Sequence, residues 1–564
     1  MAARPDASHA QRKGYRMNTT RRNFIKTVGI AGAATSVVAG TALADEPGRN
    51  GAPHTWEVVP EPIADEQIVE TVDADVVIVG AGISGVAAFM YAAEGGAKTV
   101  VVEKGTSYNG RGLDFSAIGT KVQAENGIVL DKGQIMNDLV KSSGYKANGS
   151  LIRLWADHSG WVFDRLIDMT RANGGDVVLG EGSKALADGT DFCTRAYPTD
   201  HMFGGLIVGT LDLMGRMVKV GLENGGEVRY ETRAERLVRG EDGRVCAVVC
   251  STPAGYVRFN ASKGVILASG DYGSNPEMVQ AWSPLLANAE GNVYSPEGLN
   301  TGECINMAAW VGAGIQQSCH AAMVHPIFGG GAFCPAAFLK VNAEGARVCN
   351  ELTTLPGLSN MYMTTRGKVW TIFDDDFEAQ VPQMHPLSNY NNMTAGPVTS
   401  GFLSDIWDPA NPPTQTEIVE YCLEDGTTVR ADTVEELAEK IGVPAEALTA
   451  TVARYNELAE AGVDVDFNKG AENLFPIAKP PFYASIGTAK VLAIAGALDV
   501  NSNMNVLDKQ GESIEGLYAV GNVMGNFFAN DYPICCPGLS HGRCLTLGSL
   551  IGKALAEGTT VQAL

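Results

Sequence analysis

A glycine-rich turn between two apolar segments constrains the fold of this chain more than any other feature. The sequence from residue 73 reads DADVVIVGAGISGVAAFMYAAEGGAKTVVVEKG. Residues 75–79 are apolar and β-branched, which favours a strand, and residues 86–94 favour a helix that a Gly-Gly pair ends. Residues 99–102 favour a second strand. A strand, a helix and a strand in this order predict a βαβ unit and therefore a parallel sheet.

Each glycine of the turn has its own physical role. Gly80 allows the tight turn, Gly82 lets the backbone approach a pyrophosphate at the helix N-terminus, and Gly85 lets the helix pack closely against the strand. Glu103 ends the second strand, where a carboxylate can accept a hydrogen bond from a ribose hydroxyl. The four features together predict a dinucleotide site, and the alternative is a glycine-rich turn without a ligand. The predicted turn also includes Ala81, Ile83 and Ser84.

The N-terminus carries a targeting pattern. Residues 20–26 read TRRNFIK, and an apolar, small-residue stretch follows to Ala44. This pattern is typical of a twin-arginine (Tat) signal peptide, with Met17 as a possible natural start. The alternative is a chance arginine pair before an apolar helix. We therefore expect export by the Tat machinery to the periplasm or the cell surface, and no other apolar run is long enough to span a membrane.

Composition narrows the classes of partner and cofactor. The net charge of −22 argues against nucleic acid and anionic membranes as partners. The eleven cysteines are scattered and form no CxxC or CxxCH pattern, so we expect no metal site, no iron–sulfur cluster and no haem on this chain. Only one dinucleotide unit is visible, and NAD(P)H is not expected outside the cytoplasm. The sequence therefore predicts FAD as the cofactor.

The chain resembles the flavoprotein family of fumarate reductases, succinate dehydrogenases and 3-ketosteroid dehydrogenases. The resemblance covers about residues 73–555, and its motifs occur in family order. They are EKGTSYNGRG at 103–112, RAERLVRGEDGRVCAVV at 233–249, KGVILASGDYGSNPEM at 263–278, NTGECINMAAWVGAG at 300–314, VNAEGARVCNE at 341–351, WTIFDDD at 370–376, the helical segment 433–467, and GESIEGLYAVGNVMGN at 511–526.

The resemblance implies an α/β fold: a Rossmann-like FAD-binding domain in two chain segments with an inserted α+β cap domain. We place the N-terminal extension and signal at 1–44, the two FAD-binding segments at 73–324 and 475–564, and the cap at 325–474. Two cap helices are predicted independently by apolar residues at helical spacing between 434 and 459, with Pro444 beginning the second.

The resemblance also implies further cofactor contacts beyond the first βαβ unit. They come from the segment after Glu103, from the strand pair on the adenine side, from the strand and turn near 270, and from the C-terminal return to the flavin. The residues are Lys104, Gly110, Arg111, Gly112, Ser116, Ala234, Gly270, Asp271, Gly521, Asn522, Gly538, Leu539 and Ser540.

The chain departs from the carboxylate reductases of this family at three places. The resemblance puts their proton-donating arginine at Leu355, a substrate histidine within LAIAGAL at 492–498, and a substrate arginine within Tyr532-Pro533-Ile534. A dicarboxylate in a dry site must be paired with cations. Of that set only His325 is retained, and its alternative role is that of a packed core histidine. The losses disfavour fumarate as the substrate.

The segment NDYPICCPGLSHGRC at 530–544 resembles the ketosteroid dehydrogenase type instead. There a tyrosine and a backbone amide polarise a substrate carbonyl, which suits a neutral ketone or lactone. We therefore assign Tyr532 as hydrogen-bond donor or acid and the Gly538 N–H as its partner. The alternative is that Tyr532 is only a packed aromatic. Arg543 has either a substrate role or a local capping role. The adjacent cysteines at 535 and 536 are interpreted as small buried residues rather than a disulfide or reactive thiols.

The leading functional hypothesis is an exported FAD-dependent reductase of a C=C bond conjugated to a carbonyl, in a neutral, bulky enone, steroid or lactone. Electrons would come from a membrane-anchored cytochrome or a similar carrier. The alternatives are a ketosteroid-type dehydrogenase running in the oxidising direction, a fumarate- or urocanate-type carboxylate reductase, and a non-catalytic flavin electron carrier.

Overall fold

The computed structural model describes residues 53–564, except 111, 113, 181–195, 205–206, 295, 327–328, 389–412 and 534. The expected Tat signal and the predicted cofactor residue Arg111 lie outside the described residues. Among the residues that are described, no helix combines the length and the apolar composition that a membrane span requires.

The predicted βαβ unit is present. Strand β1 (Ile68–Val79) leads into helix α2 (Ile83–Glu94), which Gly95 caps, and strand β2 (Thr99–Val102) follows. The two strands are parallel, with Val76 opposite Thr99 and Val79 opposite Val102. All four residues of β2 are buried, as expected for a strand covered on both faces.

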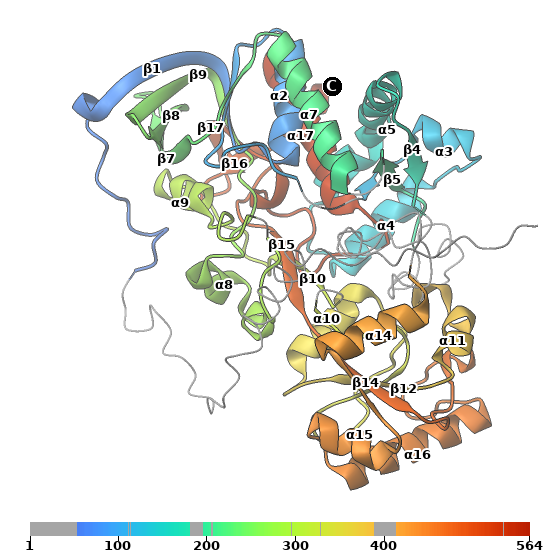
Figure 1. Cartoon of the computed structure of the whole chain (residues 1–564). Coiled ribbons are helices and arrows are strands. Elements are labelled where there is room, and N and C mark those ends of the chain that lie inside the picture. The colour runs from blue at the N-terminus through green and yellow to red at the C-terminus, as the bar shows by residue number, and fades with distance from the viewer. Residues whose placement is uncertain are drawn as a thin grey trace, which may run out of the picture. The chain divides into compact units, whose positions relative to one another are not determined.

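The sheet that contains this unit has eight strands and is built from two distant parts of the chain. Its main path runs β16-β17-β9-β1-β2-β6, and β17, β9, β1, β2 and β6 are parallel. Figure 1 shows β1, β9 and β17 side by side. Because β17 comes from the C-terminal segment, the predicted Rossmann-like fold in two chain segments is confirmed. The further strands are β6 (Glu227–Arg229), β7 (Arg233–Arg239), β8 (Val245–Thr252), β9 (Gly255–Leu267), β16 (Asn505–Leu507) and β17 (Ser513–Ala519).

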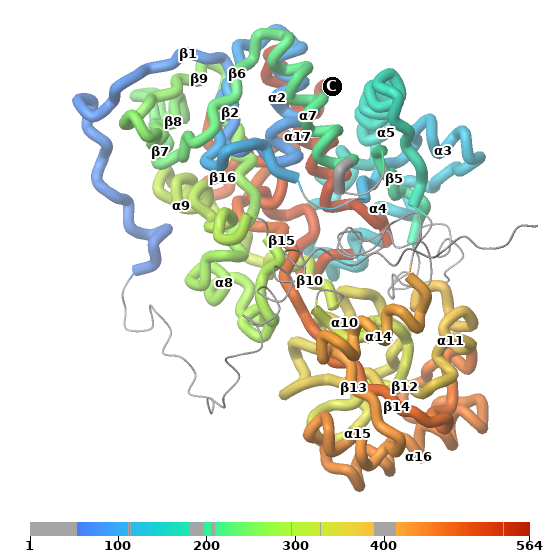
Figure 2. The backbone as a smooth tube through the Cα atoms, in the orientation of Figure 1, coloured from blue at the N-terminus to red at the C-terminus, as the bar shows by residue number. Residues whose placement is uncertain are grey.

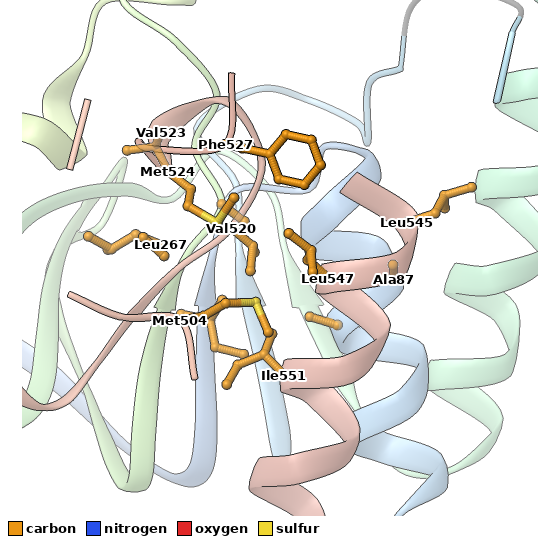
Figure 3. Close-up of a cluster of buried hydrophobic side chains, with 14 of the residues drawn as sticks. Ala87, Leu267, Met504, Val520, Val523, Met524, Phe527, Leu545, Leu547 and Ile551 are labelled. Carbon is orange, nitrogen blue, oxygen red and sulfur yellow. The ribbon is translucent and has the colours of Figure 1, made fainter. Parts of the chain in front are cut away.

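Helix α17 (Leu539–Glu557) packs directly against α2, beside this sheet. A Cβ on Gly548 would lie 2.4 Å from the Ser84 carbonyl oxygen, and a Cβ on Gly552 would lie 2.3 Å from that of Ala88. Figure 3 shows Leu547 and Ile551 of α17 in one buried cluster with Met504 and Val520 of the sheet region. The two helices can approach this closely only because Gly548 and Gly552 carry no side chain.

A small three-stranded sheet lies next to the N-terminus of α17. Its order is β3-β5-β4, with Ser116 opposite Asp200. Trp155 of the neighbouring helix donates to the Ser116 carbonyl at 3.1 Å, which fixes this edge. The elements of this region are β3 (Phe115–Ser116), α3 (Lys121–Glu125), α4 (Lys132–Ser142), α5 (Gly149–Ala172), β4 (Val177–Leu179), β5 (Asp200–Phe203) and α7 (Ile207–Glu223).

A two-stranded antiparallel ribbon stands at the passage into the predicted cap. Strand β10 (Ala321–His325) pairs with β15 (Lys490–Ala495), so the outgoing and the returning chain are hydrogen-bonded to each other. The other elements before the cap are η1 (Asp65–Gln67), α8 (Pro276–Trp282), η2 (Pro284–Asn288) and α9 (Glu303–Trp310).

The cap contains a four-stranded antiparallel sheet in the order β11-β12-β14-β13. Side chains alternate between its faces: Ile372 packs in the cluster with α15 and α16, whereas Phe373 packs with α11 and α14. Figure 2 shows α15 and α16 together on one side of β12–β14. The predicted α+β character of this region is confirmed. Its elements are β11 (Leu339–Val341), α10 (Leu355–Thr364), β12 (Trp370–Asp374), α11 (Phe377–Gln380), η3 (Val381–Gln383), α14 (Gln415–Asp425), β13 (Thr428–Ala431), α15 (Val434–Ile441), α16 (Ala445–Ala461) and η4 (Ala471–Asn473).

The strand pairing extends the cap beyond the expected boundary at residue 474. Strand β14 (Phe482–Ile486) pairs with both β12 and β13, so it belongs to the cap sheet although the sequence assigned it to the second FAD-binding segment. The motifs used for that boundary mark the return to the flavin domain near 492 and later, and they say nothing about the partners of an isolated apolar strand. The predicted helix pair is found as α15 and α16, with Pro444 as the N-cap of α16.

The glycine contact between α2 and α17 predicts a specific loss of stability. We expect Gly552→Ala to lower the free energy of unfolding by about 1–3 kcal/mol, because the added methyl group meets the backbone carbonyl of Ala88. Gly149→Ala is the matched control, since a Cβ there meets no atom within 4 Å. Chemical denaturation of both variants measures the difference, and equal stability would contradict the packing argument.

Buried His201 on β5 predicts a dependence of stability on pH. Its Nδ1 lies 2.8 Å from the Thr199 carbonyl and its Nε2 lies 2.7 Å from the Thr120 hydroxyl, which suits the neutral ring. Burial lowers its pKa from 6.5 to about 4, so the unfolded chain binds a proton that the folded chain rejects between these values. The stability that neutral His201 gives is present above pH 6.5 and is lost as the pH falls toward 4.

We expect His201→Gln to be less stable than the unmodified chain at pH 7. The difference should shrink by roughly 1.4 kcal/mol per pH unit below 6.5, because only the unmodified chain pays for excluding the proton. Urea unfolding at pH 7, 6 and 5 measures it. A difference that stays constant over this range would mean that the histidine is not excluded from protonation.

Candidate functional site

The turn after β1 has the geometry that a dinucleotide requires. Gly80 has φ +106°, and a Cβ there would lie 2.6 Å from the Ala268 carbonyl. A Cβ on Gly85 would lie 2.0 Å from the Gly80 carbonyl, so this glycine serves the close packing of turn and helix. Gly82, the N-cap of α2, differs from both, because a Cβ there would meet no atom nearer than 3.9 Å. A Cβ would fit at Gly82 without a clash, so protein packing does not require this glycine, whereas a ligand at the helix N-terminus would.

Glu103 lies beside this turn, at the end of β2. Its carboxylate accepts hydrogen bonds from the backbone N–H of Ala81 at 2.8 Å and of Gly105 at 2.7 Å. Two backbone donors hold the carboxylate in place beside the turn, and its contact with a ribose stays a prediction. Lys104 points elsewhere: its Nζ forms an ion pair with Glu303 at 2.6 Å, so its contribution to a cofactor would be indirect.

The segment after Glu103 runs toward the C-terminal helix. A Cβ on Gly110 would lie 2.3 Å from the Met214 sulfur, and one on Gly112 would lie 2.2 Å from the His541 ring. Ser116 is fully buried, and its hydroxyl has no hydrogen-bond partner among the described residues. A buried hydroxyl without a protein partner is the kind of group that a bound cofactor satisfies.

The remaining cofactor positions frame the same sheet. Ala234 is a buried residue of β7, opposite Cys250 of β8. Gly270 has φ +82°, and buried Asp271 accepts a hydrogen bond from the Asn300 amide at 2.6 Å. A Cβ on Gly521 would lie 2.5 Å from the Ser84 hydroxyl, which brings the C-terminal return of the chain onto the first turn of α2.

The N-terminus of α17 lies at the candidate catalytic site. Gly538 is its N-cap at φ +77°, and its carbonyl accepts the Ser116 N–H at 3.0 Å. The Gly538 N–H, which was expected to act with Tyr532, makes no hydrogen bond to any described residue. Leu539 and Ser540 begin the helix and are buried. The partial positive charge at this helix end favours an anionic group in front of it.

The Tyr532 hydroxyl is held at this helix end. The Ser540 N–H donates to its oxygen at 3.1 Å, and only 8% of the residue is exposed. Burial raises the pKa of Tyr532 well above its usual value, so the hydroxyl is neutral at physiological pH. Because its oxygen accepts from the helix, its own proton is directed elsewhere. Tyr532 is thus buried and neutral, and the donor role that the sequence assigns to it stays a prediction.

Arg543 lies one turn further along α17 and is fully buried. Its guanidinium donates to the Gly521 carbonyl at 2.8 Å and to the Asn522 side-chain oxygen at 2.7 Å. It also lies over the Phe528 ring, with 4.9 Å to the ring centroid, and Phe528 packs edge-on against Tyr532. Tyr532, Ser540, Asn522 and Arg543 therefore form one cluster.

His325 lies on a different element. It is the last residue of β10, where it is paired with Lys490 of β15. Burial lowers its pKa to about 4, so the imidazole is neutral at physiological pH. A neutral histidine cannot supply the positive charge that a carboxylate clamp requires.

The sequence did not indicate that a cap helix contacts the tyrosine loop. The Asn360 amide of α10 donates to the Asp531 carboxylate at 2.6 Å, directly before Tyr532 in the chain. Burial raises the pKa of Asp531. No periodicity or motif connects residues 360 and 531, so only the structure could reveal this contact. Cys535 and Cys536 are buried free thiols, and burial raises the pKa of Cys536.

These residues fit FAD. Glu103 and the turn at 80–85 would hold its adenosine and pyrophosphate, and Asn522 with the start of α17 would contact the ribitol and the flavin. Two observations of the structure support this assignment: protein packing does not require a glycine at Gly82, and the Ser116 hydroxyl has no hydrogen-bond partner among the described residues.

The glycine geometry separates two variants that look alike in sequence. We expect Gly82→Ala to fold normally but to bind FAD at least about tenfold more weakly, because its methyl group occupies the open space at the helix N-terminus. Gly85→Ala should instead destabilise the fold by about 1–3 kcal/mol through the clash with the Gly80 carbonyl. Flavin fluorescence titration of the apoprotein and denaturation measure the two effects. Wild-type FAD affinity in Gly82→Ala would contradict this placement.

Known proteins provide an independent comparison. Residues 75–539 match the model of the FAD binding domain family. The chain is 30% identical over 319 residues to the NADH:acrylate oxidoreductase of Vibrio harveyi, which covers 55% of this chain but only 28% of that protein. It is 25% identical over 519 residues to the vinyl phenol reductase of Lactiplantibacillus plantarum, covering 87% of this chain and 98% of that protein.

Solved structures show the same fold. The 3-ketosteroid-Δ4-(5α)-dehydrogenase from Rhodococcus jostii RHA1, solved with 4-androstene-3,17-dione, superposes with a TM-score of 0.67 at 24% identity, covering 88% of this chain and 99% of that one. Other matches include fumarate reductases and 3-oxosteroid dehydrogenases, so the family resemblance found in the sequence is confirmed. The chain belongs to the FAD-binding domain family and is an FAD-dependent oxidoreductase.

Proposed function

We propose that the protein reduces a C=C bond conjugated to a carbonyl group in a neutral, bulky substrate such as an enone, a steroid or an unsaturated lactone. The observation that supports this most directly is the Tyr532 hydroxyl, buried and held by the Ser540 N–H at the N-terminus of α17. A neutral donor in a dry site suits a carbonyl oxygen on which negative charge develops.

The residues of the chain divide the work as follows. Tyr532 donates its hydroxyl proton toward the substrate oxygen, and the Ser540 N–H stabilises the tyrosine oxygen as that proton is drawn away. The Asn360–Asp531 contact fixes the loop that presents the tyrosine. FAD, when bound, supplies the hydride equivalent for the β-carbon of the substrate.

A carboxylate substrate is the second candidate, because an acrylate oxidoreductase is among the relatives. The arrangement of cations argues against it. The position expected for a proton-donating arginine is Leu355, the first residue of α10, and His325 is neutral. Arg543 already donates to Gly521 and Asn522. The vinyl phenol reductase, aligned over almost its whole length, acts on a substrate without a carboxylate, which favours the neutral class.

The direction, the electron donor and the location belong to the proposal as well. An exported enzyme without haem or iron–sulfur motifs would receive electrons from a membrane-anchored cytochrome, which favours reduction as part of anaerobic respiration. The same site geometry also serves a ketosteroid-type dehydrogenase, and a non-catalytic electron carrier would need no substrate donor at all.

An anaerobic dye assay distinguishes these functions. The chain from Asp45 with FAD is reduced by a viologen, and dye oxidation is followed with fumarate, urocanate, a cinnamate, a 3-keto-4-ene steroid and an unsaturated lactone. Turnover with the neutral compounds alone supports the proposal. Turnover with fumarate or urocanate contradicts it, and no turnover with any acceptor favours the dehydrogenase or the electron carrier.

We expect Tyr532→Phe to lower kcat about 10²–10³-fold with FAD binding unchanged, because the donor to the developing negative charge is lost. Tyr91→Phe on α2 is the matched control: its hydroxyl is also buried but has no partner among the described residues. The control should retain full activity. A Tyr532→Phe enzyme as active as the control would show that the tyrosine is only a packed aromatic.

A further inference from the structure

The Arg543 guanidinium is buried, and no described residue provides a counter-charge for it. Its exposed fraction is 0%, and its two amino groups donate to the Gly521 carbonyl and the Asn522 side chain, which are neutral acceptors. Its Nε has no hydrogen-bond partner among the described residues. Phe527 and Phe528 cover it at 5.5 and 4.9 Å from their ring centroids. Within the described part of the chain, no carboxylate forms an ion pair with it.

Three buried cations of the cap differ from Arg543, because they either form ion pairs or can lose their charge. Arg347 is paired with Glu351 at 2.9 Å and with Asp464 at 2.8 Å, and Lys469 is paired with Glu351 at 3.1 Å. Lys340, which has no such ion pair among the described residues, can lose its proton, since burial lowers its pKa to about 8. An arginine cannot lose its charge in this way, because its guanidinium stays protonated at any physiological pH.

Burying a charge without a partner costs folding free energy because the charge loses its hydration. Other interactions around Arg543 must offset this cost. Its position gives the reason. Gly521 and Asn522, its two acceptors, are the residues assigned to the ribitol side of the cofactor, and Arg543 follows the first turn of α17 at the flavin. The guanidinium therefore stands directly behind the residues that would contact the flavin, in a region of low dielectric where a charge acts strongly.

We propose that Arg543 is a positioning residue that supplies a fixed positive charge behind the flavin site, and that this charge favours the reduced, anionic form of FAD over the oxidised form. It adds to the partial positive charge at the N-terminus of α17. The reduction potential of the bound cofactor is thereby higher than the helix alone would set. The proposal rests on FAD binding and not on the identity of the substrate.

The test is the reduction potential of bound FAD, measured by anaerobic equilibration with reference dyes. We expect Arg543→Met to lower the preference for reduced over oxidised FAD at least about tenfold, which corresponds to about 30 mV for a two-electron couple. Arg543→Lys keeps the charge and should stay within about threefold of the unmodified protein. This rescue separates a role of the charge from a role of the side chain in packing.

Arg543→Gln provides a second variant, in which the charge is lost but an amide donor toward Gly521 and Asn522 is kept. The potential should fall in the same direction as in Arg543→Met. This variant decides the matter if Arg543→Met does not retain FAD. Unchanged potentials in the variants that bind FAD would overturn the proposal, as would an equal fall in Arg543→Lys and Arg543→Met. An inactive substrate panel would leave the measurement valid, because it needs no substrate.

Discussion

The close approach of α17 to α2 is the contact on which the rest of the structure depends. Gly548 and Gly552 place the backbone of one helix against the backbone carbonyls of the other, and this joins the last segment of the chain to the first βαβ unit. The same approach sets Gly521 against Ser84. The van der Waals attraction between packed atoms falls steeply with their separation. One extra methyl group here would therefore loosen both the fold and the cofactor site.

This contact also fixes the loop that carries the tyrosine. The loop between β17 and α17 contains Asn526 and Ala529 at positive φ, and Gly538 at its end. Positive φ at a non-glycine residue is uncommon and persists only where the surroundings determine it. The Gln316 side-chain oxygen accepts the Asn526 N–H, and further along the loop the N-terminus of α17 and Asn360 of the cap hold Tyr532 and Asp531. The tyrosine is thus positioned by both segments of the FAD domain and by the cap.

The cap and the candidate site differ in the partners of their buried charged groups. In the cap, buried Arg347 and Lys469 are paired with Glu351 and Asp464, as in structural ion pairs. Among the described residues, the cluster around Tyr532 instead contains a neutral tyrosine and a buried arginine whose hydrogen-bond acceptors are neutral. Such a site is poorly suited to hold a dicarboxylate, and it is well suited to a ligand whose negative charge develops only during the reaction.

The sequence by itself determined the βαβ unit, the parallel sheet, the helix pair of the cap and the family, because these depend on local periodicity and on glycines at fixed spacing. It also predicted Tyr532, Ser540, Asn522 and Arg543 as site residues, and the structure brings these four together. It could not reveal that β14 pairs within the cap sheet, that Asn360 contacts Asp531, or that buried Arg543 has no ion pair with a carboxylate of the described residues. Those facts depend on contacts between residues far apart in the chain, and only tertiary packing decides which distant groups meet and which charges are left unpaired.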